Sequence, residues 1–157
     1  MLEAMTLSET IRSIEVVAAA QPAVNMVVRN DIFRLNAASD ARYGVFGWTQ
    51  GQHAENVDSP LVTYAFTFFY IDRLTEDKSN EVEVQSVGIQ TLGNIIRTLD
   101  ERGLEAGDWT YTTFNQRFLD ECAGVYCTLT LRAPVGATCS ELFGDFNDDF
   151  NDDFLIF

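Results

Sequence analysis

The segment LVTYAFTFFYIDRL, residues 61–74, is the longest predicted β-strand of the chain, because it is rich in β-branched and aromatic residues. Successive side chains of a strand point to opposite faces, and here neither the odd nor the even positions form a polar face. Such a strand is either central in a sheet, with both faces covered, or has one face against another subunit. The second alternative predicts a subunit interface at the aromatic even positions, Tyr64, Phe66, Phe68 and Tyr70.

Two helices are predicted, one at the start of the chain and one directly after this strand. Residues 7–20 have apolar residues at helical spacing, and Thr6 with Glu9 forms a capping box in front of them. Residues 81–101 show the same periodicity, with Asn80 as the predicted N-cap. Gly103 stands where a glycine commonly ends a helix.

Further strands are predicted at residues 24–28, 32–35, 43–49, 109–118 and 125–132. Residues 51–60 are predicted to be a polar connection and residues 119–124 a turn. The last strand should place alternate residues on one face, namely Val125, Cys127, Leu129 and Leu131. The order of helix, strands, helix and hairpin predicts an α+β fold with an antiparallel or mixed sheet flanked by two helices.

Length, charge and cysteine content limit the class of protein. The 157 residues suffice for one domain with a hydrophobic core. No apolar run approaches the roughly 18 residues of a membrane span, and the first 20 residues lack a signal-peptide pattern. The net charge of −14 disfavours direct binding of nucleic acid. Cys122 and Cys127 should point to opposite faces of a strand, so these two and Cys139 are expected to be free thiols in a reducing cytosol.

The last seventeen residues, ELFGDFNDDFNDDFLIF, have six acidic residues, no Lys or Arg, and the unit Phe-Asn-Asp-Asp twice in succession. We therefore divide the chain into a domain of residues 1–140 and an acidic C-terminal arm of residues 141–157. The arm is expected to be extended, because Asn and Asp are poor helix formers. We predict that its aromatic residues enter apolar pockets of a partner while its paired acids face basic residues; these docking residues are Phe143, Phe146, Phe150, Phe154, Phe157, Asp148, Asp149, Asp152 and Asp153.

No motif in the sequence indicates catalysis. His53 is the only histidine and lies in a polar stretch, so a hydrogen-bonding loop residue is expected. The cysteine spacing does not fit zinc, and glycine-rich phosphate loops are absent from the sequence. The aspartates of the arm offer oxygen ligands for calcium but lack the glycine and the closing glutamate of an EF-hand loop. Asp72, Glu76 and Asp77 lie near Arg73 and are expected to form a salt-bridge cluster with it in a turn. We predict no enzyme, no metal and no cofactor.

Short segments around the second predicted helix resemble a known group of proteins. These segments are YIDRL at 70–74, SN at 79–80, EVQS at 83–86 and LGNII at 92–96, together with TQGQH at 49–53. They resemble tail or neck proteins of phages and prophages of Bacteroidetes-type bacteria. The order of elements over roughly residues 6–134 is similar to the tail-terminator and tail-completion folds of long-tailed phages. The acidic arm is not part of that pattern.

The resemblance implies a structural virion protein, made in the cytoplasm of the bacterial host and located at the neck or tail of the virion. Such proteins form hexameric or dodecameric rings that bind other virion proteins, such as a portal-side adaptor or the tail tube. DNA passes through the ring without specific binding, and no membrane is involved. The apolar strand at residues 61–74 would suit continuation of the sheet between subunits. The alternative is a non-viral binding or adaptor module that uses the acidic aromatic arm as its docking motif.

Overall fold

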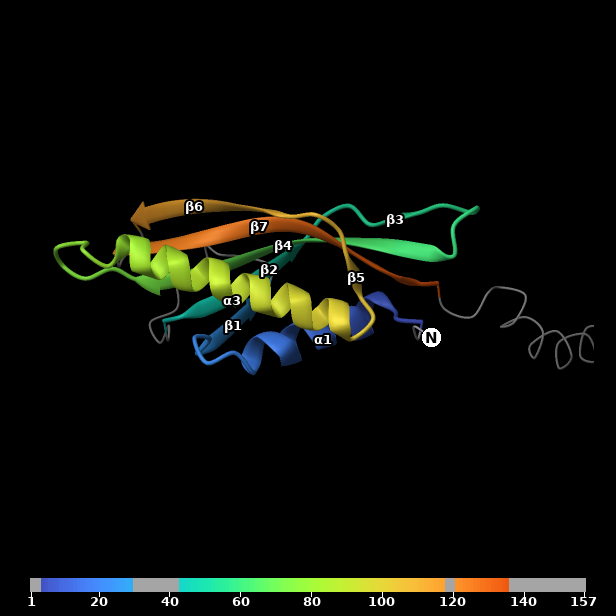
Figure 1. The fold of residues 1–157 in the computed structure, drawn as a ribbon, viewed down its shortest axis with the longest axis horizontal. Helices are drawn as coiled ribbons and strands as arrows, with labels where there is room; N and C mark the ends of the chain where they lie inside the picture. Colours follow the sequence, from blue (N-terminus) through green and yellow to red (C-terminus); the bar gives the residue numbers. More distant parts are fainter. Residues whose placement is uncertain (1–3, 30–42, 118–120, 136–157) are drawn as a thin grey trace, which may run out of the picture.

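The computed structural model describes residues 4–29, 43–117 and 121–135, and this part of the chain has an α+β fold. Two helices lie against one face of a seven-stranded mixed sheet (Figure 1), which confirms the predicted fold class. The predicted strand at residues 32–35 and the acidic arm lie outside the described residues. The elements are α1 (Leu7–Ala19), β1 (Met26–Arg29), β2 (Val45–Gln50), β3 (Ala54–Glu55), β4 (Leu61–Arg73), α3 (Glu81–Glu101), β5 (Glu105–Ala106), β6 (Thr110–Arg117) and β7 (Glu121–Pro134).

Strand β4 is at the centre of the sheet. It pairs with β2 and β3 on one side and, over its whole length, with β7 on the other. Only β1 and β2 run parallel; the other described pairs are antiparallel. Because both sides of β4 are already hydrogen-bonded within the chain, β4 has no free edge for sheet continuation between subunits. The edge strands of the described sheet are instead β1 and β3 on one side and β5 and β6 on the other.

The even positions of β4 form the centre of the hydrophobic core. Tyr64, Phe66, Phe68 and Tyr70 are between 0% and 8% exposed and pack under the two helices with Leu92, Ile95 and other residues. Side chains that are buried in their own chain offer no surface to a second subunit. The prediction that these four residues form a subunit interface is therefore wrong for this conformation, and the alternative of a central strand with covered faces describes β4.

The opposite face of the sheet carries a second, smaller apolar cluster. It contains Val45, Phe69, Ile71 and Cys122, and Phe114 packs against it. This cluster explains why the odd positions of β4 are also apolar at the end of the strand. As predicted, Cys122 and Cys127 are buried on opposite faces of β7, and Cys127 is a free thiol.

The residues at the helix termini test the predicted caps. Thr6 Oγ1 accepts a hydrogen bond from the Glu9 N–H at 3.1 Å, so the predicted N-cap of α1 is confirmed. Gly103 has a φ of 99° and ends α3 in a Schellman motif, in which the Leu104 N–H donates to the Leu99 carbonyl at 3.0 Å. Asn80 was predicted wrongly, because its side chain does not cap α3. It bonds to the preceding loop, where its Oδ1 accepts from the Thr75 N–H at 2.9 Å.

Two connections differ from the prediction. β7 begins at Glu121, so the predicted turn at residues 119–124 is wrong over residues 121–124. The polar connection at 51–60 contains the two-residue strand β3, which pairs with β4. Alternation along β7 is as predicted, since Val125, Cys127, Leu129 and Leu131 are buried. Among the described residues, no helix combines the length and the apolar composition that crossing a membrane requires.

Candidate functional site

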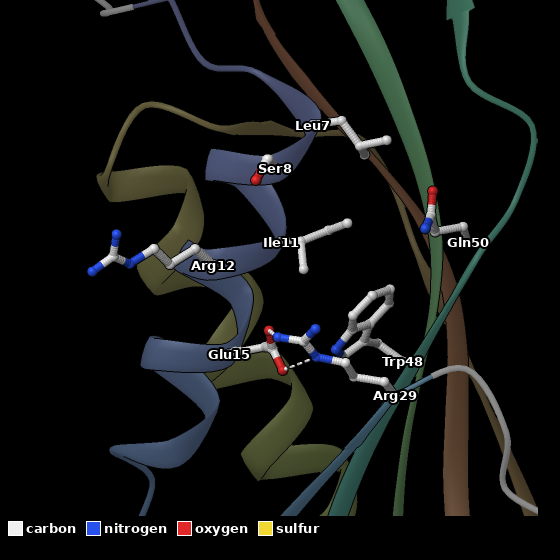
Figure 2. A pocket seen from close by; sticks show the side chains of 8 residues that line it. All are labelled: Leu7, Ser8, Ile11, Arg12, Glu15, Arg29, Trp48 and Gln50. Carbon is white, nitrogen blue, oxygen red and sulfur yellow. Dashed lines mark hydrogen bonds and ion pairs between the residues drawn. The ribbon is translucent and has the colours of Figure 1, made fainter.

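A groove between α1 and the β1–β2 edge of the sheet is the best candidate for a binding site in the described part of the chain. Its volume is about 650 Å³, which lies within the roughly 300–1,000 Å³ typical of ligand pockets. Helix α1 forms one wall, because Ile14 and Val17 hold it against the core. Figure 2 shows the residues that line the groove: Leu7, Ser8, Ile11, Arg12, Glu15, Arg29, Trp48 and Gln50.

An ion pair joins the two walls of the groove. The Arg29 guanidinium donates to both carboxylate oxygens of Glu15, with Nε–Oε2 at 2.9 Å and Nη2–Oε1 at 2.6 Å. The hydrogen bond to Glu15, followed by the charge of Glu15, raises the pKa of Arg29 above its usual value. Arg29 is well exposed, so this pair is open to exchange with another carboxylate.

Trp48 forms the floor of the groove and carries an unsatisfied donor. The residue is 2% exposed, and its ring packs edge-to-face on Phe66 at 6.2 Å between centroids. Its Nε1–H is buried, and no described residue accepts a hydrogen bond from it. Figure 2 shows this nitrogen on the side of the ring that faces the Arg29–Glu15 pair. An unpaired buried donor costs about 1–3 kcal/mol, so an acceptor brought by a ligand would recover part of that cost.

Arg12 and Gln50 stand at the rim of the groove. Arg12 is exposed, no ion pair joins it to another described residue, and its guanidinium points away from Trp48 in Figure 2. Gln50 Oε1 accepts a hydrogen bond from His53 Nε2 at 2.9 Å. The groove therefore holds two arginines and one carboxylate in a chain whose net charge is −14.

His53 is a hydrogen-bonding loop residue, as predicted. The Ala65 N–H donates to His53 Nδ1 at 3.1 Å, so the neutral ring carries its proton on Nε2 and donates it to Gln50. The ring also contacts Tyr64 and Phe66, with centroids at 5.6 and 5.8 Å. Both ring nitrogens are engaged in hydrogen bonds, one with the Gln50 side chain and one with the Ala65 N–H.

The acids near Arg73 lie at a turn, as predicted, and hydrogen bonds to Asp77 order it. Asp77 accepts from Thr75 Oγ1 at 2.8 Å and from Ser79 Oγ at 2.9 Å. The hydrogen bond from Thr75 is the main cause that lowers the pKa of Asp77. Lys78 pairs with Glu121 at 3.6 Å, which ties the turn to β7.

The described residues offer less for a metal site or in a second groove. Within residues 4–29, 43–117 and 121–135, no three His, Cys, Asp or Glu side chains are placed to share a metal ion. A smaller groove of about 300 Å³ lies between α3 and Trp109, with Arg97 and Asp100 in its lining. Asp100 Oδ1 already accepts from the Ala106 N–H at 3.0 Å, so it orders the loop after α3.

Alkaline pH is expected to destabilise the chain through two buried groups. Burial raises the pKa of Cys127 from 9.0 to about 12, and burial together with the charge of Asp72 raises the pKa of Tyr70 from 10.0 to about 12. The unfolded chain ionises these groups first, so their contribution to stability is complete below pH 9 and is lost as the pH rises toward 12. Urea unfolding should therefore show a falling midpoint over this window.

The variant Tyr70→Phe tests the contribution of Tyr70 to this pH dependence, because the stability of the variant should fall less steeply between pH 10 and 12. The matched control is Tyr126→Phe, because Tyr126 is 40% exposed on the same sheet. Equal slopes for both variants and the unmodified chain would contradict the role of Tyr70.

Comparison with known proteins does not assign the chain to a family. No protein-family model matches it, and no curated protein matches it well enough to count as a relative.

The predicted and observed site residues differ. The docking residues of the arm, from Phe143 to Phe157, lie outside the described residues. The predicted interface residues of β4 lie in the core. The groove beside α1 was missed, because no motif marks Arg29 or Trp48 in the sequence and they become neighbours only when β1 pairs with β2.

Proposed function

We propose that this protein is a structural virion protein that forms a ring at the neck or tail of a bacteriophage, as a tail terminator or head–tail connector, with DNA passing through the ring. Self-assembly occurs by contacts between copies, and the acidic arm docks on a neighbouring component of the virion. The sequence resemblance suggests this role. The observation that supports self-assembly is the pair of open edges at opposite sides of the described sheet.

One open edge is strand β6. It pairs with β7 on one side, and no described strand pairs with it on the other. Its eight residues, TYTTFNQR, include one charged residue, Arg117. Natural proteins usually protect such an edge with charges, proline or a covering segment. An edge of this length that no described strand covers is a template for pairing with another chain.

The other open edge is β1, which pairs only with β2 among the described strands. A contact between β6 of one copy and β1 of the next would join two different surfaces. Head-to-tail contacts of this kind generate closed rings when the rotation closes. The net charge of −14 supports the same role, because an acidic lumen would repel DNA and let it slide.

Oligomeric state tests the proposal. We expect the full-length protein to run as a hexamer or a dodecamer in light scattering, and to show rings with a central hole in negative-stain electron microscopy. A lysine on the outer strand should interfere with pairing at that edge. The variant Thr112→Lys is therefore expected to weaken assembly by about tenfold in concentration.

The matched control is Thr128→Lys, which places the same charge on the same face of β7, one strand away from the edge. A full-length protein that stays monomeric at high concentration would refute the ring and favour the adaptor alternative. Equal assembly of both lysine variants would exclude β6 as the contact.

A further inference from the structure

The groove beside α1 presents donors that the described residues leave unsatisfied. Trp48 Nε1–H is buried without a partner, although a buried indole N–H usually has one. Arg12 is exposed without an ion pair to another described residue. Arg29 reaches a single carboxylate, Glu15, and remains accessible. A ligand that fits must supply hydrogen-bond acceptors and negative charge.

The same groove has an apolar side. Leu7 and Ile11 are half-buried and pack on the edge of the core, and Figure 2 shows them on the α1 wall above Trp48. Aromatic side chains bury a large area on such a surface. The groove therefore fits a peptide that alternates aromatic residues with acids and amides.

The C-terminal segment of this chain has that composition. Residues 141–157 contain the unit Phe-Asn-Asp-Asp twice. We propose that the groove beside α1 binds the Phe-Asn-Asp-Asp segment of a neighbouring copy of the chain. A phenylalanine packs on Leu7 and Ile11, one aspartate pairs with Arg29 in exchange with Glu15, and an amide or main-chain oxygen accepts from Trp48 Nε1. Arg12 receives a further carboxylate at the rim.

The described chain ends on the side of the molecule where the groove begins. The Val135 N–H donates to the Pro60 carbonyl at 2.9 Å, and Tyr64 on the same strand donates its hydroxyl to the Met5 carbonyl at 2.9 Å. Figure 1 shows the end of β7 near the start of α1. The five residues 136–140 can span about 17 Å when extended, so residues 141–157 can reach beyond the edge of their own molecule.

This inference rests on the proposed function. A ring needs contacts between copies, so the Phe-Asn-Asp-Asp segment in the groove should come from a neighbouring copy. The arm and the groove are different surfaces of one chain, so binding between copies is head-to-tail and can close a ring. Docking of the arm on its own groove would leave the copies unconnected. That outcome is separated from the proposed one by the experiment below.

The test uses two full-length variants. The first, the arm variant, carries Phe146→Ala, Phe150→Ala and Phe154→Ala and keeps its groove. The second, the groove variant, carries Arg12→Gln and Arg29→Gln and keeps its arm. We expect neither to bind itself through this contact, whereas a mixture should form a heteromeric complex in sedimentation. A groove control with Arg97→Gln and Arg102→Gln, two exposed arginines of the α3 region, should behave as the unmodified chain.

A spectroscopic measurement places the contact at Trp48. The chain has two tryptophans, so Trp109→Phe leaves Trp48 as the only one. In the arm variant with this change, synthetic peptide 141–157 should shift the tryptophan emission. Adding Arg12→Gln and Arg29→Gln should weaken peptide binding at least tenfold, as should replacing the four paired aspartates of the peptide by asparagine.

The outcomes are distinct. No emission shift and no complex in the mixture would overturn the inference. Rings formed by the arm variant would show that the protein assembles into rings without the contact between arm and groove. A shift with peptide but no mixed complex would assign the docking to the same chain and overturn the neighbouring-copy source. A mixed complex would support the groove, whereas an unmodified chain that forms no closed rings would count against the ring.

Discussion

Replacing Phe68 by alanine is expected to destabilise the chain by about 3–5 kcal/mol. Phe68 is fully buried in the centre of β4 and contacts Phe46, with ring centroids 5.3 Å apart, and Phe66 at 6.1 Å. Alanine would remove these contacts and leave a cavity that the paired strands on both sides cannot close. A loss of this size approaches the whole stability of a small domain.

Urea unfolding at several protein concentrations measures this effect. The free energy of unfolding should fall by the same amount at each concentration, because Phe68 belongs to the core of one chain. Thr67→Ala is the control on the other face of the same strand and should change stability by less than about 1 kcal/mol. A Phe68→Ala variant that folds normally but assembles poorly would restore the subunit interface that the structure contradicts.

The variant Gly124→Ala is expected to cost about 3 kcal/mol, the upper part of the usual range for overpacking. A methyl group at Gly124 would overlap the main-chain carbonyl oxygen of Tyr70 and would lie 2.7 Å from Phe114 Cζ. The Phe114 ring can turn away, but the Tyr70 carbonyl belongs to the central strand. Relief of the overlap therefore requires β4 and β7 to separate locally.

Thermal unfolding of Gly124→Ala should show a clearly lower midpoint. Gly51→Ala is the matched control, because the added methyl group would lie 3.1 Å from Ala65 Cβ, with no backbone atom closer than the Ala65 carbonyl oxygen at 3.6 Å, in an exposed connection. It should change stability by about 1 kcal/mol or less. Equal effects of the two substitutions would contradict the close approach of Gly124 to β4.

The helices were predictable, because their signals are local. The apolar periodicity and the Thr6 cap placed α1 within one residue of its observed end, and α3 has the predicted bounds. Asn80 was misread because its side chain had two competing sets of partners. Its Oδ1 accepts from the Thr75 N–H and its Nδ2 donates to the Arg73 carbonyl, so it bonds the loop and not the first turn of α3.

The short strands were harder to predict. β3 has only two residues, and it exists because it meets β4, which no local pattern reveals. The start of β7 was taken for a turn, since Glu121 and Gly124 are weak strand formers. In the sheet, Gly124 is favoured because only a residue without a side chain fits against Tyr70.

The sequence by itself determined the class of the fold, the two helices, the long strand and the unusual composition of the arm, since each of these is encoded in neighbouring residues. Only the tertiary structure decided which face of β4 is core and where a groove lies. Helix α1 covers the face of the sheet that carries the even-numbered residues of β4. The parallel pairing of β1 with β2 places Arg29 beside Trp48. Such contacts join residues far apart in the chain, and their energy depends on strand order and helix position, which no local pattern contains.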